Sequence, residues 1–182
     1  GSVFTENKFF SENPSAIPFI LYSDGVSLTY PLQPETSKEN KCICVYYSLA
    51  NIAEHQKSKI DPLKLVCYIK ENYFKAYQDV VTRLIINDII KLEDGIKTST
   101  GEVLQVGLLC YCCDNLEAHI ISGLQKSFGA GYICCYCHQK HENLTDDIFG
   151  ENSQRRTKEN YDEAVSVIEI GGETYGVKKM CI

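Results

Sequence analysis

The chain has 182 residues and a net charge of −6, with 44% hydrophobic and 23% charged residues. This composition is typical of one globular domain with a substantial core. The acidic balance argues against a protein that grips nucleic acid by bulk charge, because phosphate contacts need clustered Lys and Arg. It does not exclude a catalytic core whose basic DNA-binding parts lie elsewhere in a longer chain. No apolar run approaches the roughly 20 residues that a membrane span requires.

The chain contains ten cysteines, and several of them lie inside apolar, strand-like runs. These are Cys42, Cys44, Cys67, Cys110 and Cys112. A buried free cysteine behaves as a small hydrophobic residue. The pattern therefore favours a reducing compartment over the disulfide framework of a small secreted protein.

The first third of the chain predicts an arm followed by strands. Residues 1–17 are polar and predict an N-terminal arm, and residues 18–22 form a short apolar strand that delivers Ser23-Asp24-Gly25 into a turn. A second short strand and a loop are expected over residues 26–40. Residues 42–49 and 63–69 are rich in β-branched and aromatic residues, which indicates two further strands.

The middle of the chain changes period. Apolar residues recur every three or four positions over residues 73–93, which predicts an amphipathic helix that ends at Asp94-Gly95. Residues 103–113 then predict a long strand that ends at Asp114. A helix over residues 116–128 follows, and a Cys-x-x-Cys sequence, Cys134 to Cys137, comes next.

The last part of the chain predicts a polar loop over residues 138–162 and a hairpin with a glycine turn over residues 165–177. The organisation expected is therefore an arm at 1–17, an α/β core at 18–133, and a segment at 134–182 with a cysteine knuckle, a polar insertion and the hairpin. Early strands followed by alternating helix and strand indicate a mixed sheet flanked by helices.

Asp24 and Asp114 each follow an apolar strand. If these strands are neighbours in one sheet, the two carboxylates come within reach of each other. Mg²⁺ and Mn²⁺ prefer oxygen ligands, and a pair of such ions can hold both oxygens of a phosphodiester displacement. The alternative is that both aspartates are ordinary turn formers.

Cys134 and Cys137 have the spacing of half a zinc site, and a structural zinc ion needs four ligands. His141 is the nearest plausible partner, because His138 directly abuts Cys137. Cys135 and His119 are further options. The alternative is a pair of ordinary thiols; a redox role is less favoured because the motif follows a helix instead of opening one.

Two other features carry weaker signals. His119 lies on the helix directly after Asp114, where a capping or partly buried histidine is the competing interpretation. The basic cluster Arg155, Arg156 and Lys158 could contact phosphate, but such a run is more typical of a solvated face.

Two stretches together resemble a known family. The first is Cys113-Asp114-Asn115-Leu116-Glu117-Ala118-His119, followed by Gly123, Phe128 and Cys134-Cys135-Tyr136-Cys137. The second is Ile20-Leu21-Tyr22-Ser23-Asp24 with Pro31-Leu32 and the run from Val45 to Ile52. In this order, over most of residues 17–180, they resemble the catalytic core of eukaryotic cut-and-paste DNA transposases, with a CACTA-like element as the best candidate. Arg156-Thr157, Tyr161 and Gly176-Val177-Lys178 resemble that family's later linker.

The resemblance implies a ribonuclease H-like fold in which an Asp-Asp-Glu triad binds two Mg²⁺ or Mn²⁺ ions. Asp24 would be the first catalytic carboxylate and Asp114 the second, while Cys134 and Cys137 would belong to a zinc knuckle. It further implies a nuclear protein that cleaves and joins transposon-end DNA, with a homo-oligomer among its assemblies and no membrane partner.

The chain departs from the family pattern at several positions. Gly25 to Tyr30 lack the acidic and Asn residues expected there, Cys113 and Glu117 each replace a Gly, and no third catalytic Glu can be assigned before the chain ends. Glu163, Glu169 and Glu173 do not lie on a helix of the expected kind. We therefore expect an incomplete active site. The competing expectation is a non-catalytic, zinc-stabilised module that binds DNA or protein.

Overall fold

The computed structural model describes residues 2–27, 41–57, 59 and 62–178. Its helices are α1 (Ser2–Glu6), α2 (Lys8–Glu12), α3 (Glu54–Lys57), α4 (Glu71–Asp94), α5 (Asn115–Ile121), the 3₁₀ helix η1 (His141–Asn143) and α6 (Lys158–Ser166). Its strands are β1 (Ile17–Ser27), β2 (Lys41–Leu49), β3 (Lys64–Lys70), β4 (Ile96–Lys97), β5 (Val103–Leu104) and β6 (Val106–Cys112). The chain forms two compact units, Gly1–Cys113 and Asp114–Ile182.

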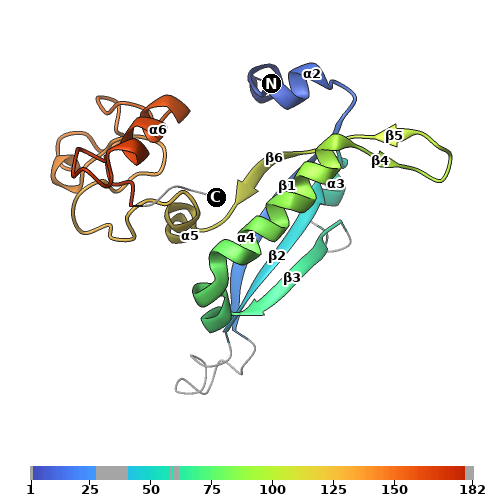
Figure 1. Cartoon of the computed structure of the whole chain (residues 1–182), viewed down its shortest axis with the longest axis horizontal. Coiled ribbons are helices and arrows are strands. Elements are labelled where there is room, and N and C mark those ends of the chain that lie inside the picture. The colour runs from blue at the N-terminus through green and yellow to red at the C-terminus, as the bar shows by residue number, and fades with distance from the viewer. Residues whose placement is uncertain (1, 28–40, 58, 60–61, 179–182) are drawn as a thin grey trace. The chain divides into compact units, whose positions relative to one another are not determined.

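The first unit is built on a four-stranded mixed sheet in the order β3-β2-β1-β6 (Figure 1). β1 pairs antiparallel with β2, and β2 pairs antiparallel with β3. β1 pairs parallel with β6, which returns to the sheet after the long helix α4. Strands β4 and β5 form a separate small hairpin. The predicted α/β class with a mixed sheet and helices is confirmed.

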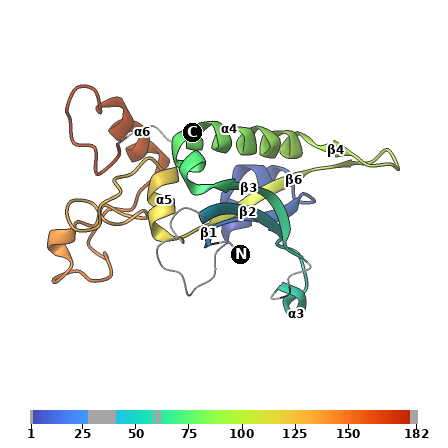
Figure 2. The same ribbon diagram turned by 90° about the horizontal axis from the view of Figure 1, so that it is seen from below.

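Helix α4 covers one face of this sheet (Figure 2). The core beneath it contains Phe19, Leu21 and Val45, with Ile85 and Ile89 of the helix packed against them. Alternate residues of a strand point to opposite faces, so Phe19 and Leu21 meet the helix while their neighbours face the other way. A cavity of about 610 Å³, lined mainly by apolar side chains, lies between α4 and the sheet.

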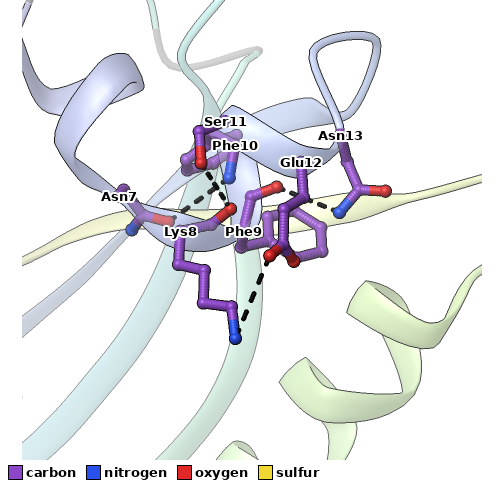
Figure 3. Close-up of polar contacts among 7 residues, drawn as sticks. All are labelled: Asn7, Lys8, Phe9, Phe10, Ser11, Glu12 and Asn13. Carbon is purple, nitrogen blue, oxygen red and sulfur yellow. Dashed lines mark hydrogen bonds and ion pairs between the residues drawn. The ribbon is translucent and has the colours of Figure 1, made fainter.

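The opposite face of the sheet is covered in part by α2, whose short turn is held by local polar contacts (Figure 3). Asn7 Oδ1 accepts the amide of Phe10 at 3.3 Å, and Asn13 Nδ2 donates to the carbonyl of Phe9 at 3.0 Å. These contacts present Phe9 and Phe10 to Gly107 of β6, where an added Cβ would overlap the Phe9 ring. The absent side chain at Gly107 is what makes room for the helix.

The second unit contains little regular structure. Its small core consists of Leu124, Ala164 and Val177, with Tyr161 and Ile168 packed against it. Leu124 and Val177 form an isolated antiparallel bridge, so the end of this unit is tied back to the segment after α5. Within the described part of the chain, no helix combines the length and the apolar character needed to cross a bilayer.

Several local expectations are corrected. The expected arm forms α1 and α2, and β1 continues through Asp24 to Ser27, past the expected turn. The strand expected over residues 103–113 divides into β5 and β6, and the helix expected to residue 128 ends at Ile121. Most of the strand and loop expected over residues 26–40 lies outside the described residues.

The predicted hairpin over residues 165–177 is wrong. Helix α6 ends there, and turns follow it. A capping box starts this helix: Thr157 Oγ1 accepts the Asn160 amide, and Asn160 Oδ1 accepts the Thr157 amide. Because Thr157-x-x-Asn160 is visible in the sequence, it is a signal that could have identified the helix.

Candidate functional site

The strands that lead to Asp24 and Asp114 are hydrogen-bonded neighbours. In the parallel pair of β1 and β6, Ile17 lies opposite Val106 and Tyr22 lies opposite Cys112. One irregularity in register falls between Phe19 and Ile20. Both strands run in the same direction, so their carboxyl ends lie at the same edge of the sheet.

Asp24 comes two residues after Tyr22 and lies inside β1, where its partner across the antiparallel pair is Cys44. Its side chain is exposed. The turn-former alternative does not describe Asp24, because its backbone is part of a strand that continues to Ser27. An exposed carboxylate on a paired strand can bind a cation without first paying the cost of ordering a loop.

Asp114 comes two residues after Cys112 and belongs to the second unit. It is the N-cap of α5: its Oδ1 accepts the amide of Glu117 at 2.7 Å. Asp114 therefore has a structural role as a helix cap, in line with the alternative that it shapes the local backbone. A carboxylate has two oxygens, so this one hydrogen bond does not use up its capacity to bind a hard cation.

Cys134 and Cys137 lie in a loop whose two ends are tied together within the second unit. Tyr132 and Lys140 form an isolated antiparallel bridge, and the amide of Ile133 donates to the carbonyl of Gln139 at 3.0 Å. This closure brings the two thiols together, and they share a hydrogen bond. The loop borders a pocket of about 190 Å³.

Backbone amides point at both sulfur atoms of this pair. The amide of Tyr136 donates to Cys134 Sγ at 3.3 Å, and the amide of Gln139 hydrogen-bonds Cys137. Burial nevertheless raises the pKa of the Cys137 thiol, and the neighbouring Cys134 raises it further, while the Gln139 amide and Arg156 oppose this. The Cys137 thiol therefore favours its protonated form until something replaces the proton.

Arg156 corrects the expectation of a solvated basic face. Its guanidinium is half-buried: Nε donates to the carbonyl of Cys134 at 3.1 Å, and Nη2 donates to the carbonyl of Tyr175 at 2.7 Å. Arg155 and Lys158 are exposed, as expected of a solvated run. Arg156 thus ties the cysteine loop to the segment that follows α6.

His141, the predicted third zinc ligand, lies at the base of the loop, where its amide donates to the carbonyl of Gly131 at 2.8 Å. Over residues 2–27, 41–57, 59 and 62–178, no three His, Cys, Asp or Glu side chains are grouped so that they could hold a metal ion. The structure therefore brings Cys134 and Cys137 together but does not bring His141 to them. A structural zinc ion needs four ligands, so these residues do not by themselves complete such a site.

His119, the optional ligand on α5, is fully buried. Its Nδ1 lies 2.8 Å from the carbonyl oxygen of Gln125, and because a carbonyl can only accept, Nδ1 carries the proton. The ring meets Phe128 edge to face at 4.8 Å between centroids. These contacts give His119 a structural role in closing the turn after α5.

The remaining acidic candidates differ in setting. Glu163 lies on a helix, α6. Glu169 and Glu173 lie in the turns after that helix. Since the described residues contain no metal-competent group of three, none of these glutamates is grouped with two other such side chains.

The chain matches none of the protein-family models and none of the curated proteins with which it was compared.

Proposed function

We propose that this chain is part of the catalytic core of a DNA transposase, with Asp24 and Asp114 as two of its metal-binding carboxylates. The observation that supports this most is the parallel pairing of β1 and β6, with Tyr22 opposite Cys112. Each aspartate follows two residues later in its own chain segment. A mixed sheet with helices is also compatible with the ribonuclease H-like core that the sequence motifs imply.

The residues suit hard divalent cations. Both carboxylates are exposed, and oxygen donors are what Mg²⁺ and Mn²⁺ prefer. When bound, such ions polarise a phosphodiester and activate water or a 3′ hydroxyl for in-line displacement. In this proposal the contribution of the chain is two carboxylates, Asp24 near the end of β1 and Asp114 just after β6, as ligands for these ions. The full assembly would act on transposon ends in the nucleus as a homo-oligomer.

A metal titration tests the proposal. We expect Mn²⁺ to bind the wild type at millimolar concentration or below, and the Asp24→Asn/Asp114→Asn variant to lose this binding. Asn at position 114 keeps the helix cap while removing the charge, because Asn caps as well as Asp. Asp162→Asn, on the exposed side of α6, is the matched control and should bind as the wild type does. Absence of wild-type binding at millimolar Mn²⁺ would refute the site.

The second candidate function is a non-catalytic module, derived from a transposase, that binds DNA or protein and is stabilised by zinc. The thiol pair Cys134 and Cys137, with amides directed at both sulfurs, is the observation that favours it. Zinc would take these two thiolates, and His141 with a fourth donor would have to move to complete the ligand set. Elemental analysis decides this: one equivalent of zinc supports the module, and less than half an equivalent counts against it.

A further inference from the structure

A second pair of thiols lies on β6, away from the cysteine loop. The sulfur atoms of Cys110 and Cys112 are 3.9 Å apart, and both side chains are exposed. Residues two apart on a strand point to the same face, so both thiols share one side of the sheet. Neither cysteine belongs to the carboxylate pair or to the loop of the second unit.

The sheet holds these two thiols in fixed positions. Cys110 lies opposite Ile20 and Cys112 lies opposite Tyr22 in the parallel pair with β1. β6 is at one end of the strand order, so the thiols lie at an accessible margin of the sheet. Tyr22 stacks on Tyr46 of the next strand at 5.5 Å between centroids, so an aromatic pair lies beside the thiols.

The geometry of this pair does not favour a disulfide bond. Cα atoms two residues apart on a strand are separated by about 6.6 Å, close to the upper limit of roughly 6.8 Å for disulfides. The sulfurs would have to close from 3.9 Å to about 2.05 Å. Such closure would bend a strand that is hydrogen-bonded to β1.

A soft metal ion fits the pair without that distortion. Sulfurs that share one ion at a metal–sulfur distance of about 2.3 Å can lie up to about 4.6 Å apart, and the observed 3.9 Å is within this reach. A structural zinc ion needs four ligands. In the described ranges, no three His, Cys, Asp or Glu side chains are grouped so that they could bind a metal ion. Thiolates select Cu(I), a soft ion that is satisfied by two sulfur donors.

We propose that Cys110 and Cys112 form a two-thiolate site for Cu(I). Binding replaces the two thiol protons, which pass to solvent, and leaves copper in its original oxidation state. The site is independent of the proposed carboxylate function, and either can fail without the other.

The test is an anaerobic titration of Cu(I) against a chelator of known affinity. The parent protein carries Cys134→Ser and Cys137→Ser, which removes the thiol pair of the cysteine loop. We expect it to bind one equivalent of Cu(I) with sulfur-to-copper charge-transfer absorption. Cys110→Ser and Cys112→Ser should each weaken binding by about 100-fold or more, because the second donor then no longer acts within the same molecule.

Cys113→Ser is the matched control, since Cys113 is adjacent in sequence to the pair but lies after the end of β6. It should leave both stoichiometry and affinity unchanged. Far-ultraviolet circular dichroism verifies that each variant is folded. Copper X-ray absorption should show two sulfur neighbours in the parent. Unchanged affinity in folded Cys110→Ser or Cys112→Ser, or an equal loss in Cys113→Ser, would overturn the proposal.

Discussion

At the scale of single residues, Asp114 combines a structural task with a proposed functional one. Its position after an apolar strand was visible in the sequence, and so was the alternative of a turn-forming residue. Its capping bond to Glu117 depends on where α5 begins. The predicted helix begins at residue 116, one residue later than the observed start at Asn115, so that boundary does not place Asp114 at the cap position.

Substitution of Asp114 should separate these two tasks. Asp114→Ala removes the acceptor for the Glu117 amide, so we expect the free energy of unfolding to fall by about 0.5–2 kcal/mol. Asp114→Asn should remain within a few tenths of a kcal/mol of wild type. Urea denaturation followed by circular dichroism measures both. Equal destabilisation by Ala and Asn would show that charge, and not the cap, stabilises this turn.

His138 provides a prediction about pH. Its ring stacks on Tyr175 at 4.3 Å, and burial lowers the pKa of the imidazole, with Arg156 lowering it further and Glu173 opposing. The unfolded chain therefore binds a proton at a higher pH than the folded chain does. The contribution of His138 to the free energy of unfolding is therefore fully present above the unfolded pKa of about 6.5. It is lost as the pH falls through the lower pKa of the folded state.

The variant His138→Phe keeps an aromatic ring against Tyr175 but cannot titrate. We expect the free energy of unfolding of the wild type to decline more steeply between pH 7 and pH 5 than that of this variant. Denaturant titrations at several pH values measure the difference. Parallel declines would mean that the carboxylates, and not His138, set the pH dependence.

At the scale of elements, long periodic segments were predictable and short ones were not. The 3.6-residue pattern located α4 and its end at Gly95, although the irregular backbone of Tyr77 within it left no sequence signal. Residues 165–177 looked like a hairpin because they combine β-branched residues with Gly171-Gly172. The capping box of Thr157 and the packing of Ala164 instead favour helix α6, which runs to Ser166 and is followed by turns, so local capping and tertiary contacts outweighed β-propensity at the start of this segment.

The packing of α2 on β6 rests on Gly107. Gly107→Ala should destabilise the protein by about 1–3 kcal/mol, because the new methyl group would overlap the Phe9 ring. Gly129→Ala is the matched control, since a Cβ there meets nothing within 4 Å. Thermal unfolding of the two variants tests this. Equal melting temperatures would show that Phe9 moves aside at little cost.

At the scale of the whole molecule, the sequence motifs indicated the two strands that lead to Asp24 and Asp114. The order of these strands in the sheet depends on long-range pairing, which the motifs do not contain. The prediction required β1 to neighbour the strand before Asp114, and the structure pairs β1 with β6 in parallel. Nothing local in either strand encodes that partnership, which depends on the crossover through α4. The zinc prediction depends on long-range placement in the same way: spacing brings Cys134 and Cys137 together, whereas His141 follows the loop closure and the described residues hold no group of three potential ligands.

The central claim is that Asp24 and Asp114 share a divalent cation, and paramagnetic broadening by Mn²⁺ in an NMR spectrum of the assigned protein tests it most directly. The account predicts that the amides of residues 23–25 and 113–115 broaden together, at the same substoichiometric Mn²⁺ concentration, and that Asp24→Asn abolishes both effects. Broadening of one segment alone, or uniform broadening of all exposed acidic residues, would contradict it.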